Sequence, residues 1–200
     1  MSARQRTRRI GVLGGSFDPP HVGHVILAQE CWWQLALDEV RLVPAARSPL
    51  KQGEARFAGD VRSRMVARAV AGHPALTVSR IELEREPPSY TVDTLEVFAQ
   101  AEPESDLWLI LGGDQLMDLG RWRLPDRIVS LARLAVAARP GDDRALLESA
   151  AASVAPGRVD WVEMPGIGVS STMIRERLDA GRPVRYLVPD GVEELAREAG

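Results

Sequence analysis

The residues with the clearest chemical potential are two histidines, His21 and His24, in a segment that reads G-G-S-F-D-P-P-H-V-G-H over residues 14–24. Glycines lack a Cβ and let the backbone approach a ligand closely, and residues three apart in a helical turn share one face. A helix start adds free N–H groups and the positive end of the dipole. We therefore predict a phosphate site here. The alternative of a zinc pair lacks a third ligand nearby in the sequence.

A second helix start is predicted where three hydroxyl residues follow one another in G-V-S-S-T-M-I-R, residues 168–175. One hydroxyl suffices to cap a helix, so Ser170, Ser171 and Thr172 offer donors beyond capping. Arg175 lies one turn further and can fold back over an anion bound at the helix end. Capping with a surface arginine is the plainer alternative.

Composition excludes several other classes of protein. The chain has 200 residues, 45% of them hydrophobic, which is enough for the core of one domain. A net charge of -3 argues against a general nucleic-acid coat protein. The only cysteine, Cys31, excludes an internal disulfide. Without an apolar run of about 18 residues or a signal peptide, we expect a cytoplasmic protein that binds neither nucleic acid nor membrane. The oligomeric state stays open.

The arginine-rich start, residues 1–8, is predicted to be a disordered tail, with an RNA-binding arm as the alternative. Neither a G-x-x-x-x-G-K-[ST] loop nor a G-x-G-x-x-G turn after the first predicted strand occurs. A P-loop enzyme and an ordinary dinucleotide dehydrogenase therefore lose their main support. The only lysine, Lys51, lies in a polar stretch, residues 45–58, that is predicted to be a loop.

Apolar runs alternate with segments of helical periodicity along the chain. Strands are predicted over residues 9–13, 40–43, 76–78, 107–111, 134–138 and 159–162, and helices over 22–37, 60–71, 91–100, 145–155, 170–180 and 190–199. Strands without polar alternation indicate a mostly parallel sheet with helices on both faces, a doubly wound α/β fold. Such sheets bind ligands beyond the carboxyl ends of their strands.

The chain resembles the nucleotidyltransferase superfamily that carries H-x-G-H and S-S-T-x-I-R signatures, and within it the bacterial nicotinate mononucleotide adenylyltransferases. The matching segments cover nearly the whole chain: 14–24, S-Y-T-V-D-T-L at 89–95, L-G-G-D at 111–114, L-G-R-W at 119–122, A-R-P-G at 138–141 and V-S-S-T-M-I-R at 169–175. H-x-G-H is shared with pantetheine-phosphate adenylyltransferases and cytidylyltransferases. The segments S-Y-T-x-D-T and D…W narrow the resemblance to the pyridine nucleotide branch.

The resemblance implies transfer of the adenylyl group of ATP to nicotinate mononucleotide, which gives deamido-NAD and pyrophosphate. The acceptor phosphate attacks the α-phosphorus directly, so catalysis depends on alignment and charge stabilisation. Mg²⁺ is expected with ATP, held by phosphates and water, with no protein ligand. The implied catalytic residues are His21, His24, Lys51 and Arg175. Those implied to bind ATP are Gly14, Gly15, Ser16, Phe17, His24, Gly112, Asp114, Ser170, Ser171, Thr172 and Arg175.

The acceptor nucleotide is implied to contact Ser16, Lys51, Tyr90, Thr91 and Trp122, with Trp122 stacking on the pyridine ring. For Trp122 the alternative is burial in the core, and for Asp114 it is a helix cap. The chain departs from the branch at S-P-L-K, residues 48–51, where a histidine usually precedes the lysine. Two other functions stay open: an adenylyltransferase for phosphopantetheine, and a nucleotide sensor without catalysis.

Overall fold

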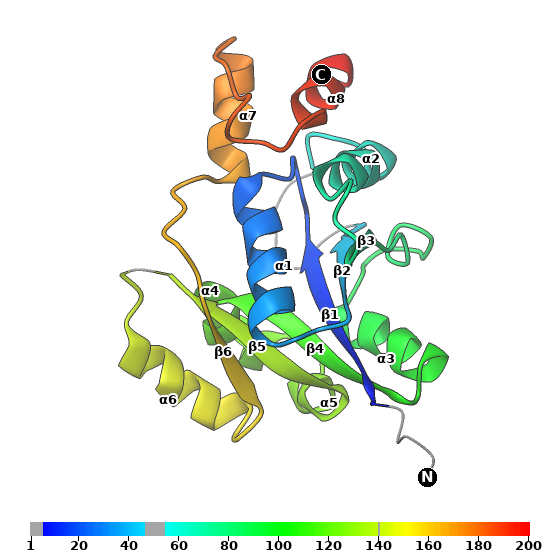
Figure 1. Cartoon of the computed structure of the whole chain (residues 1–200), viewed down its shortest axis with the longest axis vertical. Coiled ribbons are helices and arrows are strands. Elements are labelled where there is room, and N and C mark those ends of the chain that lie inside the picture. Colours follow the sequence, from blue (N-terminus) through cyan, green and yellow to red (C-terminus); the bar gives the residue numbers. More distant parts are fainter. Residues whose placement is uncertain (1–5, 47–54, 140) are drawn as a thin grey trace.

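A computed structural model describes residues 6–46, 55–139 and 141–200 of the chain (Figure 1). Its centre is a six-stranded parallel sheet in the order β3-β2-β1-β4-β5-β6. The strands are β1 (Arg8–Gly15), β2 (Glu39–Pro44), β3 (Leu76–Val78), β4 (Ser105–Gly112), β5 (Ala132–Ala138) and β6 (Val159–Glu163). This is the strand order of a doubly wound fold, and it confirms the predicted class.

Helices cover both faces of this sheet. They are α1 (Val22–Gln34), α2 (Gly59–Ala69), α3 (Thr91–Ala101), α4 (Gly113–Asp118), α5 (Pro125–Leu131), α6 (Arg144–Val154), α7 (Ser171–Asp179) and α8 (Val192–Glu198), with a 3₁₀ turn at Leu119–Arg121. Helices α3, α4, α5 and α6 contribute buried residues to one face and α1 and α2 to the other. Helices α7 and α8 pack on the outer side of α2 at one end of the molecule (Figure 1).

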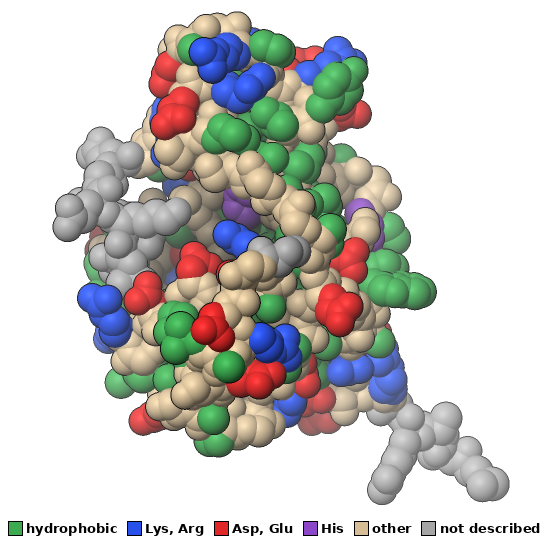
Figure 2. All heavy atoms as spheres, turned by 90° about the vertical axis from the view of Figure 1, so that its left-hand side faces the viewer, with side chains coloured by type: hydrophobic (Ala, Val, Ile, Leu, Met, Phe, Trp, Pro, Cys, Tyr) green, Lys and Arg blue, Asp and Glu red, His purple; other side chains and the backbone are tan. Residues whose placement is uncertain are grey.

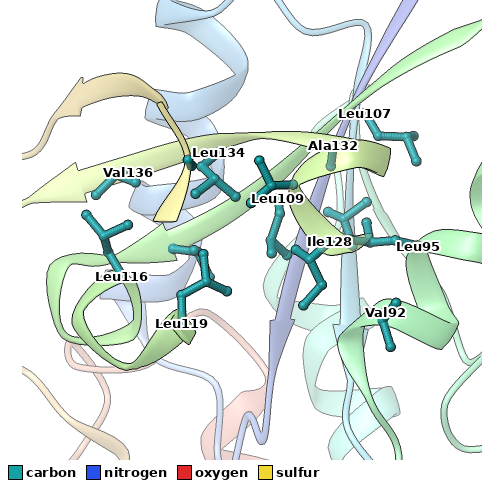
Figure 3. Packing of buried hydrophobic residues seen from close by; sticks show 14 of the residues in the cluster. Val92, Leu95, Leu107, Leu109, Leu116, Leu119, Ile128, Ala132, Leu134 and Val136 are labelled. Atoms are coloured by element: carbon teal, nitrogen blue, oxygen red, sulfur yellow. The ribbon is translucent and has the colours of Figure 1, made fainter. Parts of the chain in front are cut away.

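The strands are apolar on both sides because each side meets a helical layer. In β4, Leu107, Leu109 and Leu111 face the α3–α6 layer, while Trp108 and Ile110 face α1 and α2. Figure 3 shows leucines of the sheet against side chains of α3, α4 and α5. Fully burying each such side chain contributes about 1.5–3 kcal/mol. The result is a rigid sheet whose carboxyl edge can hold a ligand site.

The predicted strands are all present, and none of their ends differs from the prediction by more than two residues. Helix α5 was not predicted, and α4 was considered only as the alternative in which Asp114 caps a helix, because six or seven residues give too little periodicity to detect. The tail prediction is wrong for Arg8, which begins β1 and forms ion pairs with Glu39 and Glu102. In the described part of the chain, no helix is long and apolar enough to cross a bilayer.

Candidate active site

The site lies where the strand order reverses, between β1 and β4. From β1 the sheet continues through β2 to β3, and from β4 it continues through β5 to β6. The carboxyl end of β1 leads into Gly14, Gly15 and Ser16, and that of β4 into Gly112, Gly113 and Asp114. Ligands of doubly wound sheets bind in the crevice at this point, so two of the predicted segments meet where the fold favours binding.

The turn after β1 is held by buried contacts. Phe17 has a φ of 46° and is 1% exposed, so its side chain is packed into the core. Both carboxylate oxygens of Asp18 accept backbone hydrogen bonds, from the N–H groups of Arg56 at 2.9 Å and Phe57 at 3.0 Å. Asp18 is 6% exposed. This anchoring fixes the direction from which the chain enters α1.

The two histidines stand together at the start of α1. His21 is the N-cap residue, and its backbone N–H donates to Nδ1 of His24 at 3.1 Å. Because Nδ1 of His24 accepts this bond, the ring proton of a neutral His24 lies on Nε2. The ring centroids are 3.8 Å apart. Figure 2 shows a histidine side chain beside a basic side chain inside a hollow of the surface.

Burial and a nearby cation keep His21 neutral. Burial, and secondly the charge of Arg139, lower the pKa of His21 from 6.5 to about 4. Nδ1 of His21 is buried and has no hydrogen-bond partner among the residues that the structure describes. At neutral pH this imidazole therefore offers hydrogen bonds to a phosphate without carrying a positive charge.

The second predicted helix start meets the first. The hydroxyl of Ser171 donates to the carbonyl of Pro19 at 2.9 Å, and Nη1 of Arg175 donates to the carbonyl of Asp18 at 2.7 Å. The other side of the Arg175 guanidinium donates to the Thr172 hydroxyl at 3.2 Å. These bonds join α7 to Asp18 and Pro19, which lie three and two residues before His21 and some 150 positions before α7. The two predicted helix starts therefore lie against the same turn.

All three hydroxyls at the start of α7 form hydrogen bonds within the protein, and not only the one that caps the helix. Oγ of Ser170 accepts from the backbone N–H of Met173 at 3.2 Å, which caps the helix. Ser171 joins α7 to the turn before α1, and Thr172 accepts from Arg175. What α7 presents outward is the set of free N–H groups of its first turn, supported by these side chains.

A buried arginine that the sequence analysis did not select ties the turn together. Arg62 of α2 is 2% exposed and donates to the carbonyl oxygens of Phe57, at 3.0 Å, and Ser16, at 2.6 Å. A longer contact of 3.4 Å reaches the carbonyl of Ala46. The Arg62 guanidinium therefore joins the turn after β1 to Ala46 and Phe57, which lie in the sequence on either side of residues 47–54.

At the end of β4, glycine permits a close approach. A Cβ on Gly112 would lie 2.7 Å from Oδ1 of Asp114 and 3.9 Å from Nη2 of Arg139. Asp114 is exposed at the start of α4, as expected for a side chain that contacts a ribose. Arg139, which follows β5, was not selected as a site residue, although it stands in the quoted A-R-P-G segment and after a predicted strand.

Three of the five residues expected to hold the acceptor nucleotide line one cavity, whereas Ser16 does not line it and Lys51 lies outside the described residues. This cavity has a volume of about 300 Å³ and includes Tyr90, Thr91 and Trp122. The remaining lining residues are Ser89, Arg121, Arg123 and Ile128. The guanidinium of Arg123 lies 4.6 Å from the centre of the Tyr90 ring. Trp122 is partly buried against the core, so its packing role and its place in the cavity coexist.

Two further regions of the chain do not contribute to the described site. Lys51 and the departure at residues 48–51 lie outside the described residues. A second cavity, of about 400 Å³, lies between α2 and α8, where Arg64, Arg68, Glu194 and Glu198 mix both charges. None of the predicted site residues that the structure describes lines this second cavity. The candidate site is therefore the crevice at β1 and β4 together with the aromatic cavity.

Known proteins are similar to this chain over most of its length. Residues 12–177 match the family model described as cytidylyltransferase-like. Relatives named "Probable nicotinate-nucleotide adenylyltransferase" include one from Roseiflexus sp., 45% identical and covering 92% of each chain. One from Thermus thermophilus is 43% identical over 96% of this chain and 98% of its own.

Solved structures share the fold. The nicotinic acid mononucleotide adenylyltransferase of Plasmodium falciparum complexed with NaAD superimposes with a TM-score of 0.79 at 15% identity. The match covers 96% of this chain and 95% of that one. The same enzyme complexed with APC gives a TM-score of 0.76.

Proposed function

The chain belongs to the cytidylyltransferase-like family, and from this membership and the site we propose that it is a nicotinate-nucleotide adenylyltransferase of NAD biosynthesis. It joins the adenylyl group of ATP to the 5′-phosphate of nicotinate mononucleotide and releases pyrophosphate. One observation carries the proposal: α7 is hydrogen-bonded, through Ser171 and Arg175, to the turn at Asp18 and Pro19 that leads into α1. Relatives over 40% identical bear that enzyme's name.

The proposed chemistry needs no protein nucleophile. The acceptor phosphate attacks the α-phosphorus of ATP, and the bond to the bridging oxygen of pyrophosphate breaks. Negative charge grows on that leaving group, where preorganised donors stabilise it most. The donors are the imidazole N–H groups of His21 and His24 and the free backbone N–H groups of α7. Arg175 adds positive charge from the α7 side, with one face already held by the carbonyl of Asp18.

The aromatic cavity suits the pyridine ring of the acceptor. Trp122 and Tyr90 offer ring faces for stacking. Helix α3 begins at Thr91 and its N-cap, Tyr90, makes no side-chain capping bond, so free N–H groups point from its first turn. No acidic residue is among the described residues that line the cavity, while Arg121 and Arg123 are. This environment favours a carboxylate over an amide on the ring, as in nicotinate.

The proposal also covers the metal ion, the role of Lys51 and the cellular compartment. Mg²⁺ would accompany ATP, held by phosphate oxygens and water. Lys51 neutralises phosphate oxygens. The enzyme works in the cytoplasm, in keeping with a chain that has a single cysteine.

Product analysis tests the proposal. The protein is incubated with ATP, Mg²⁺ and an equal mixture of nicotinate and nicotinamide mononucleotides, with phosphopantetheine in a parallel reaction. We expect pyrophosphate together with deamido-NAD in excess over NAD. Product from phosphopantetheine alone would assign the chain to the other adenylyltransferase, and nucleotide binding without any product would make it a sensor.

A further inference from the structure

A buried polar cluster lies behind the aromatic cavity and has no part in the mechanism above. Glu82, Ser89 and Thr94 are 7%, 5% and 2% exposed. They belong to the S-Y-T-V-D-T segment and to the irregular stretch that precedes it, residues 79–90. Buried polar side chains cost free energy unless they are hydrogen-bonded, so this cluster needs a structural reason.

The hydrogen bonds of the cluster run in one direction. Arginine can only donate, and Nη2 of Arg85 donates to Oγ1 of Thr94 at 2.9 Å. The single hydroxyl proton of Thr94 then goes to Oε1 of Glu82, 2.8 Å away. The Ser89 hydroxyl makes a longer contact of 3.4 Å with the carbonyl of Glu82. The threonine hydroxyl is thus the link between the cationic and the anionic side chain.

The charged groups on either side of Thr94 make the loss of its hydroxyl costly in free energy. Burial raises the pKa of Glu82, and Asp93 adds to the rise, while the bond from Thr94 and the charge of Arg85 oppose it. Nε of Arg85 is buried without a hydrogen-bond partner among the described residues. Removal of the Thr94 hydroxyl would leave the buried carboxyl group of Glu82 and the partly buried guanidinium of Arg85 without their shared partner, which is costly.

The cluster is joined to the cavity wall through the chain itself. Ser89, Tyr90 and Thr91 line the cavity, and Thr94 lies one helical turn after Tyr90 on α3. Thr94 fastens this first turn to Glu82 and Arg85 in the stretch that leads into it. Neither Thr94 nor Glu82 is among the residues that line the cavity.

We propose that Thr94, with Glu82 and Arg85, is a positioning residue for the acceptor nucleotide: it holds Ser89, Tyr90 and Thr91 in the geometry that receives the pyridine ring. The inference rests on the proposed function. It predicts an effect on one substrate only, because the triphosphate site is built from β1, α1, α7 and the end of β4.

The test compares Thr94→Val, which keeps the shape and removes the hydroxyl, with Thr94→Ser, which keeps the hydroxyl. Leaving buried partners unsatisfied costs enough to raise KM for nicotinate mononucleotide about tenfold in Thr94→Val. We expect KM for ATP to change less than about twofold, and Thr94→Ser to resemble the wild type. Circular dichroism and thermal unfolding establish that each variant is folded.

Thr77→Val is the matched control, because the Thr77 hydroxyl also donates to a glutamate, Oε1 of Glu39 at 2.6 Å, away from the cavity. It should lower stability and leave both KM values unchanged. If Thr94→Val does not fold, Glu82→Gln is measured in the same way, with a smaller rise for nicotinate mononucleotide alone. Unchanged KM values, or equal rises for both substrates, would overturn the positioning role. A wild-type protein inactive with nicotinate mononucleotide would instead refute the proposed function.

Discussion

At the start of α1, His21 and His24 determine how the site can stabilise negative charge. The His21 backbone fixes the ring of His24 through Nδ1, and burial keeps His21 neutral. The pair therefore supplies directed hydrogen bonds, while positive charge comes from Arg175 and Arg139. Donors in a fixed position suit a reaction whose charge moves onto a leaving group, because they need little reorganisation.

Loss of one of these donors should reduce turnover without loss of the fold. We expect His24→Ala to lower kcat by at least about 100-fold, the range seen when a donor to transition-state charge is removed. His73→Ala is the control, since His73 packs edge-on against Trp32 outside the site. Steady-state assays of pyrophosphate release check both variants. Wild-type turnover in His24→Ala would remove this residue from the mechanism.

The lowered pKa of His21 has a consequence for stability. In the unfolded chain His21 takes up a proton near pH 6.5, whereas in the folded protein it does so only near pH 4. Between these values the unfolded state binds more protons, so stability falls as the pH is lowered from about 6.5 to 4. Thermal unfolding of His21→Asn should lose less over this window than the wild type. Parallel losses in both proteins would contradict the assigned pKa.

Among the secondary-structure elements, α1 and α7 are important because both begin at the candidate site. They are joined to one turn by Ser171 and Arg175, and that turn is joined to α2 by Arg62. The free N–H groups of two helices and the imidazoles of one are thus held in place before any ligand arrives. Preorganisation of this kind is what a reaction driven by alignment requires.

Arg62 should contribute strongly to stability through its carbonyl partners. In Arg62→Met the buried carbonyl oxygen of Phe57 and the partly buried one of Ser16 lose their donor, which costs at least about 2 kcal/mol of unfolding free energy. Urea denaturation measures the change. Arg64→Met, on the same helix but exposed, should change stability by less than about 0.5 kcal/mol. Equal effects of the two substitutions would show that the carbonyl contacts of Arg62 contribute little.

The sequence sufficed for the strands and for both helix starts, because apolar runs and the segments around His21 and Ser170 are local patterns. It did not identify Arg62 or Arg139, since in a chain with 25 basic residues, all but one of them arginine, only the fold distinguishes a buried guanidinium. Helices α4 and α5 were too short to detect. The Thr94 link was hidden because its partners, Glu82 and Arg85, lie in an irregular segment.

For the whole molecule, the strand order explains why the site residues come from every part of the chain. Reversal between β1 and β4 opens one crevice at the carboxyl edge. The segment after β1, the segment after β4 and the start of α7 all reach it, although they are spread over residues 14–175. The aromatic cavity adds residues from the start of α3 and from the 3₁₀ turn that follows α4.

The most direct measurement is a crystal structure of the protein with a non-hydrolysable ATP analogue and nicotinate mononucleotide. The phosphates should contact His21, His24 and the first-turn N–H groups of α7 together, with the pyridine ring against Trp122. A triphosphate bound to only one of the two helix starts, or bound in the cavity between α2 and α8, would contradict the account.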